Sequence, residues 1–120
     1  GYMTPKVGPH VTYGFAPGNI YGKKADLLFR PDMVGCDNPE IEFLTALSEN
    51  GTKLYLIAMC QSNDSQSCTV TLDLSQIVAN KTGFRSAKAL QGKIIRSAGK
   101  KGQINLDFAP WGMNVIEISL

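Results

Sequence analysis

The feature that most constrains this chain is an alternation of apolar and polar residues with a period of two. It runs through residues 68–74, 103–108 and 114–120. Successive side chains of a β-strand point to opposite faces, so this alternation predicts half-buried antiparallel strands. A fold made of such strands must bury one face of each sheet against another layer.

One predicted strand, residues 52–60, is apolar on both faces. One face carries Leu54, Leu56, Ala58 and Cys60, and the other carries Tyr55, Ile57 and Met59. A strand of this kind is central and covered on both sides. In a sandwich only one side is core, so the second face must be covered by a loop, by the N-terminal segment or by another domain. We therefore expect the second row to be a domain-docking face.

The predicted fold is all-β: an antiparallel two-sheet β-sandwich of the immunoglobulin-like or Greek-key type. Further strands are expected at residues 25–29, 41–48, 84–91 and 93–97, and turn signals separate them. About eight short strands result, with a single helical turn at 74–78 capped by Ser75. Residues 25–120 form the sandwich domain, and residues 1–24, rich in Gly, Pro and Tyr, form an extended leader or linker.

Length and charge exclude several classes of protein. A chain of 120 residues suits one domain. A net charge of +2 without a clustered basic patch does not predict nucleic-acid binding. No apolar run approaches the ~20 residues of a membrane span, so we expect no membrane-spanning segment.

No catalytic constellation is present in the sequence. It contains no GxSxG elbow, HExxH motif or P-loop, and its one histidine, His10, lies in the leader. The acidic residues Asp32, Asp37 and Glu40 are explained by a hydrogen-bonded turn more simply than by calcium. We expect no enzymatic activity from this chain alone, no cofactor and no metal site.

The three cysteines leave two interpretations open. Cys60 and Cys68 share the core-facing parity of strands joined by the loop at 61–67. They either form a disulfide in an oxidising compartment or remain two small buried thiols. Cys36 then has no partner within the chain.

Four aromatic residues are candidates for stacking against a sugar ring: Tyr13, Tyr21, Tyr55 and Trp111. The alternative is packing against the core or a neighbouring domain, and it is favoured for Tyr55 and Trp111. For Trp111 a structural role is favoured, in a turn shaped by Pro110 and Gly112, because Pro fixes its backbone and Gly tolerates positive φ.

The sequence from about residue 50 to residue 120 resembles the C-terminal β-sandwich domain of multidomain glycoside hydrolases. These are enzymes with a (β/α)8 catalytic barrel, such as α-L-arabinofuranosidases. The segments that carry the resemblance are "GTKLYLIAMCQSNDSQSCTVTLDLS" and "SAKALQGKIIRSAGKKGQINLDFAPWGMNVIEISL", and "DLLFRPDMVGCDNPEIEFLTALSENGTKL" is similar to the stretch that leaves the barrel. Such a barrel needs about 250 residues, so none of the family's catalytic carboxylates can be assigned to this chain.

The resemblance implies a non-catalytic accessory domain that supports or docks on the catalytic barrel of a polysaccharide-degrading enzyme. The implied partners are the catalytic domain of the same parent chain and a polysaccharide, and the implied location is secreted, periplasmic or cell-surface. Two alternatives remain: a stand-alone carbohydrate-binding module, and an immunoglobulin-like spacer or adhesion domain of a surface protein. The latter lacks the Cys…Trp…Cys order of true immunoglobulin domains, because Trp111 follows all three cysteines.

Overall fold

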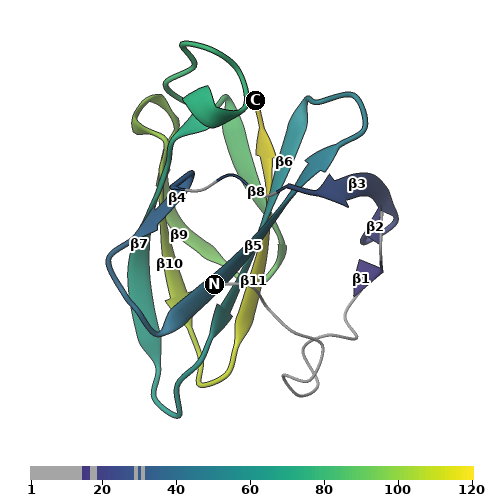
Figure 1. Ribbon diagram of the computed structural model, residues 1–120. Coiled ribbons are helices and arrows are strands. Elements are labelled where there is room, and N and C mark those ends of the chain that lie inside the picture. Colours follow the sequence, from purple (N-terminus) through teal and green to yellow (C-terminus); the bar gives the residue numbers. More distant parts are fainter. Residues whose placement is uncertain (1–14, 17–18, 29, 31) are drawn as a thin grey trace.

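The computed structural model describes residues 15, 16, 19–28, 30 and 32–120 as two antiparallel sheets packed face to face (Figure 1). The larger sheet has the order β1-β2-β3-β5-β6-β11-β8 and the smaller one β4-β7-β10-β9. The strands are β1 (Phe15–Ala16), β2 (Asn19–Ile20), β3 (Lys23–Leu27), β4 (Val34–Cys36), β5 (Ile41–Ser48), β6 (Lys53–Cys60), β7 (Gln66–Leu72), β8 (Ser86–Gln91), β9 (Ile94–Ala98), β10 (Gln103–Phe108) and β11 (Met113–Ser119). This arrangement confirms the predicted all-β sandwich.

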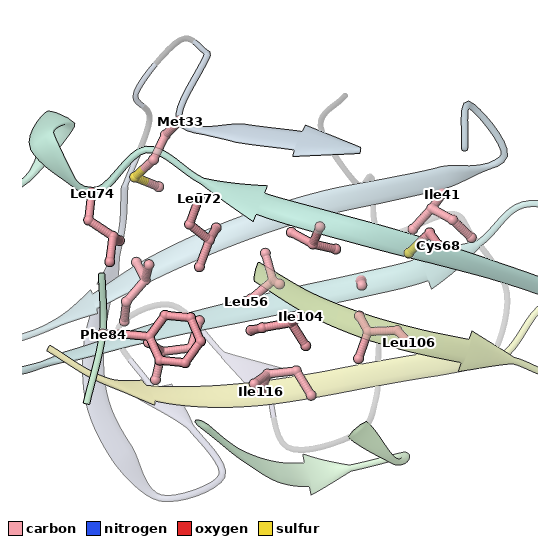
Figure 2. Close-up of a cluster of buried hydrophobic side chains, with 14 of the residues drawn as sticks. Met33, Ile41, Leu56, Cys68, Leu72, Leu74, Phe84, Ile104, Leu106 and Ile116 are labelled. Carbon is pink, nitrogen blue, oxygen red and sulfur yellow. The ribbon is translucent and has the colours of Figure 1, made fainter. Parts of the chain in front are cut away.

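The main core lies between the two sheets and is built from inward-facing residues of their strands, together with Met33, Leu74 and Phe84 from the connecting segments (Figure 2). Strand β7 contributes Cys68, Val70 and Leu72, and β10 contributes Ile104 and Leu106. These are the apolar members of the alternating pattern in the sequence. Their polar neighbours face outward, which leaves the outer surface of the four-stranded sheet hydrophilic.

Strands β6 and β11 occupy the middle of the larger sheet, and both are buried on both faces. This confirms the expectation for β6. It corrects the one for β11, which was predicted to be half-buried. Its second face, with Val115 and Glu117, is buried as well, and Val115 packs in a cluster with Ile20 and Ala25 of β2 and β3.

The alternation of apolar and polar residues in the sequence did not predict two short elements of the fold. Strand β4 has only three residues and contains Gly35, so it shows no alternation. The hairpin of β2 and β3 lies partly in the segment predicted to be irregular, and β3 begins at Lys23 rather than at residue 25. Its loop is Tyr21–Gly22, with φ of 48° and 79°, the geometry of a two-residue type I′ turn.

A single helical turn follows β7, as expected, at Leu74–Gln76. Its cap is Asp73 and not Ser75. The Asp73 carboxylate accepts a hydrogen bond from the backbone N–H of Ser75 at 3.2 Å. The expected cap was wrong because the helical turn begins at Leu74, and the capping residue lies just before the first helical residue.

Candidate functional site

A polar groove runs over the outer face of the four-stranded sheet, across β7, β10 and β9. It consists of two adjoining hollows of about 580 Å³ and about 240 Å³. The hollows share Ser67, Ile95 and Asp107. Their other lining residues are Ser65, Gln66, Lys93, Phe108 and Ala109 in the larger and Asp37, Cys68, Thr69, Asn105 and Leu106 in the smaller.

Hydrogen bonds fix the polar groups at the narrower end of the groove. The backbone N–H of Thr69 donates to the Asp37 carboxylate at 2.8 Å. The Asn105 amide donates to the Thr69 hydroxyl at 3.1 Å, across the paired strands β10 and β7. The side chains are therefore pre-positioned, and their remaining donors and acceptors are available to a hydroxyl-bearing ligand.

The wider end of the groove is held by a buried asparagine. The side chain of Asn114 accepts from the backbone N–H of Lys93 at 2.8 Å and donates to the carbonyl of Asp107 at 3.1 Å. It thereby ties the β8–β9 turn to the end of β10. Ile95 adds an apolar surface to this end and is 49% exposed.

The sequence pattern identified the polar positions of the groove individually but not as one surface. Their assembly depends on the pairing of β7 with β10 and of β10 with β9, which joins residues far apart in the sequence. The outward parity of residues 67–71 and 103–107 was the available signal. This signal indicates one shared surface only when the order of the strands in the sheet is known.

Trp111 lies in the turn between β10 and β11, at the same end of the sandwich as the β6–β7 loop (Figure 1). Its indole N–H donates to the Asn63 side chain at 2.8 Å, and its backbone N–H donates to the carbonyl of Ser62 at 3.1 Å. The ring is 39% exposed. These contacts give Trp111 a structural role between two loops and leave part of its surface free.

The geometry of that turn differs from the expected one. Trp111 has φ of 56°, whereas Gly112 is not among the residues with positive φ. Gly112 is required for space, because a Cβ atom there would lie 2.9 Å from the carbonyl oxygen of Ala109. The same carbonyl accepts the hydrogen bond from the Gly112 N–H that closes the turn, at 2.8 Å.

The other aromatic candidates are not part of the groove. Tyr21 belongs to the β2–β3 turn, and its hydroxyl donates to the side chain of Gln91 on β8, in the seven-stranded sheet. Tyr13 lies outside the described residues. Sugar stacking by these residues stays a prediction.

The row of Tyr55, Ile57 and Met59 lies on the outer face of the seven-stranded sheet, and all three side chains are buried. Tyr55 and Ile57 belong to a second hydrophobic cluster, which Ile20 and Ala25 of the β2–β3 hairpin help to form. The sequence predicted this row to be a domain-docking face that requires a cover. The N-terminal strands pack against it, which is one of the three kinds of cover that the sequence left open.

The second cluster has a partly exposed apolar rim. Tyr21, Leu44 and Leu90 pack against it without being fully buried. Leu27, which pairs with Ala46 of the cluster, is 48% exposed. These four residues are called the outer rim below.

A buried tyrosine–carboxylate pair lies next to this cluster. The Tyr55 hydroxyl donates to Glu117 at 3.0 Å, and Lys23 lies 3.9 Å from the same carboxylate. Burial raises the pKa of Tyr55 to about 12, and the Glu117 charge contributes to the increase. The hydrogen bond and the lysine compensate the carboxylate for its loss of water.

All three cysteines are free thiols. Cys60 and Cys68 both face the main core, as their parity predicted, but they belong to different sheets. The Cys60 thiol lies 3.9 Å from the carbonyl of Ser62 and 3.8 Å from that of Asp64. Cys68 is the diagonal neighbour of Cys36 across β7 and β4, and the sequence had left Cys36 without a partner.

Within the described part of the chain, no group of three or more His, Cys, Asp or Glu residues is placed to hold a metal ion. The same residues contain no helix with the length and apolar character needed to cross a membrane. Comparison with protein-family models, with curated proteins and with solved structures gave no match. What is established is therefore the β-sandwich fold.

Proposed function

We propose that this chain is a non-catalytic accessory β-sandwich domain of a polysaccharide-degrading glycoside hydrolase, docked on the catalytic barrel of the same parent chain. The observation that carries the proposal is the second hydrophobic cluster on the outer face of the seven-stranded sheet. The sequence resemblance described above supplies the class of enzyme.

The outer rim is the surface that the proposal assigns to docking. The main core already satisfies the inner face of β6, so the second cluster is an additional apolar layer. Its cover within the described residues is the narrow β2–β3 hairpin, and Leu27 remains 48% exposed beside it. A neighbouring domain placed there would remove the remaining apolar surface from water.

The test uses the full-length protein and a pair of matched variants. Leu27→Glu places a charge on the outer rim, and Ile95→Glu places one at a residue of equal exposure, 49% against 48%, on the other sheet. We expect Leu27→Glu to lower the melting temperature of the full-length protein and to increase proteolysis between its domains. The control should change neither, and equal effects of the two variants would refute docking through the rim.

The coding sequence on the N-terminal side of Gly1 provides an independent test. A (β/α)8 barrel encoded there supports the proposal, because the accessory domain would then follow its catalytic domain in one chain. A domain of any other class encoded at that position would overturn it.

The polar groove favours a second candidate function, a carbohydrate-binding module. Carboxylate, amide, hydroxyl and ammonium groups converge on it beside the apolar side chain of Ile95. Protein sites for small molecules combine such polar groups with apolar contacts. Binding along this groove would rest on hydrogen bonds more than on ring stacking, because its one aromatic lining residue, Phe108, is buried.

Affinity electrophoresis through gels containing soluble polysaccharides tests this candidate. Retardation that is lost in Asp107→Ala but kept in Asp26→Ala would assign binding to the groove, because Asp26 is likewise an exposed carboxylate but lies on β3. Unretarded migration in arabinan, xylan and β-glucan gels would leave the accessory role without a binding function.

A further inference from the structure

We propose that Cys36 and Cys68 form a disulfide that fastens β4 to β7 when the folded domain meets a low-molecular-weight disulfide such as oxidised glutathione. The pairing is distinct from the Cys60–Cys68 bond, which the sequence left as one of two alternatives. It does not depend on the proposed function.

The strand register places the two cysteines side by side. Cys36 pairs with Val70 across β4 and β7, so Cys68 is its diagonal neighbour, two residues along the partner strand. Diagonal positions of this kind face the same side of a sheet. Both residues accordingly pack in the main core, Cys68 fully and Cys36 partly buried.

Polar contacts fix the residues that follow Cys36 next to Cys68. The Cys36 sulfur accepts from the backbone N–H of Asn38 at 3.4 Å, and the Asn38 amide donates to the carbonyl of Ser67 at 3.0 Å. The turn after β4 is therefore anchored against the start of β7, next to Cys68.

The remaining movement needed for a bond is small and falls on the part of the fold that yields most easily. Diagonal neighbours have Cα atoms about 7–8 Å apart, whereas disulfides span about 4.4–6.8 Å. Strand β4 is an edge strand of three residues that pairs only with β7 among the described strands. It can shift by the required distance without breaking a second ladder.

The chemistry is a balanced two-step exchange. The Cys36 thiolate, which is partly exposed, attacks the disulfide of oxidised glutathione, forms a mixed disulfide and releases one glutathione thiolate. The Cys68 thiolate then attacks the Cys36 sulfur and releases the second glutathione. Each cysteine loses one proton, and the two electrons reduce the glutathione disulfide.

The second step depends on the pH. Burial raises the pKa of the Cys68 thiol, and the neighbouring Cys36, Asp37 and Asp107 raise it further. Because the thiolate is the attacking species, closure of the bond speeds up as the pH rises. We therefore expect faster closure above neutral pH than at neutral pH.

Cys60 is a weaker partner for either residue. It is fully buried on β6, in the opposite sheet, and its thiol faces the carbonyls of the β6–β7 loop. Bonding it to Cys68 would require movement of a central strand. The edge strand β4 offers the easier path.

Digestion before aspartate residues tests the pairing, because it places each cysteine in its own peptide: 32–36, 37–63 and 64–72. The folded protein is oxidised with oxidised glutathione at about pH 8.5, near the ordinary thiol pKa, then alkylated and digested. We expect peptide 32–36 linked to peptide 64–72. We also expect the melting temperature to rise by roughly 5–10 °C on oxidation.

Cysteine variants distinguish a Cys36–Cys68 disulfide from other products of cysteine oxidation. Cys60→Ala should keep the link and the rise in melting temperature, and Cys36→Ser should lose both. A link between peptides 37–63 and 64–72 would overturn the proposal in favour of Cys60–Cys68. A product in which Cys36 and Cys68 stay separately alkylated or glutathionylated, or a disulfide between two copies, would overturn it equally.

Discussion

At the scale of single residues, the Tyr55–Glu117 pair shows how the larger sheet tolerates a buried carboxylate. The two residues face each other on paired strands, and the tyrosine hydroxyl supplies the hydrogen bond that the carboxylate loses from water. A buried charge without such a partner is costly. The pair thus allows β11 to occupy the centre of the sheet although it carries a glutamate.

The raised pKa of Tyr55 predicts a stability change at alkaline pH. The folded pKa of about 12 exceeds the unfolded value of 10.0, so the protonated phenol stabilises the fold below about pH 10. This stabilisation is lost as the pH rises from 10 to 12. Urea denaturation should therefore show a steeper fall in the free energy of unfolding for the wild type than for Tyr55→Phe over that range.

The stability of the Tyr55→Phe variant below pH 10 provides a control. It should be less stable than the wild type by about 1–3 kcal/mol below pH 10, because Glu117 loses a buried hydrogen bond. The two proteins share every other group that titrates in the alkaline range. Parallel pH profiles for the two would contradict the role assigned to the phenol.

At the scale of elements, the β2–β3 hairpin acts as a cover for the second cluster. Its type I′ turn at Tyr21–Gly22 reverses the chain tightly, which brings Ile20 and Ala25 onto the outer face of the larger sheet. Ile20 is buried there, next to the row that the sequence left uncovered. The hairpin is thus part of the packed fold.

Truncation of Ile20 tests this role. We expect Ile20→Ala to lower the free energy of unfolding by roughly 2–4 kcal/mol, the usual cost of removing a buried isoleucine side chain. Ile95→Ala, at an exposed position of the other sheet, should change it by less than about 0.5 kcal/mol. If the two variants unfold alike in urea, the hairpin does not hold the cluster.

The sequence predicted the longer strands, and it missed those that are too short to show an alternation of apolar and polar residues. Strands β5 and β10 have the predicted bounds, and β10 alternates because only one of its faces meets a hydrophobic core. Strand β4 is too short to alternate, and a Tyr-Gly pair is informative only once two strands flank it. The groove needs the pairing of β7 with β10, which no local pattern contains.

At the scale of the whole molecule, the fold depends on a strand that pairs with distant parts of the chain. Strand β11 pairs with β6 on one side and with β8 on the other. It also contributes Ile116 and Ile118 to the main core and Val115 to the second cluster. Both hydrophobic layers are therefore incomplete without it.

Deletion of residues 113–120 should abolish cooperative unfolding. The loss leaves β6 and β8 with unpaired edges and opens both clusters to water. Thermal denaturation followed by circular dichroism should show no sharp transition, and a synthetic peptide of residues 113–120 should restore one. A truncated chain that melts cooperatively on its own would disprove the dependence.

The central position of β11 also sets an order of events during biosynthesis. Strands β6 and β8 leave the ribosome before β11 does, and they cannot pair with each other in the native order. The nascent chain therefore keeps two strand edges and two apolar surfaces open until residues 113–119 have emerged. During that interval it is a substrate for chaperones that bind extended apolar segments, and pauses in translation before β11 would prolong the exposure.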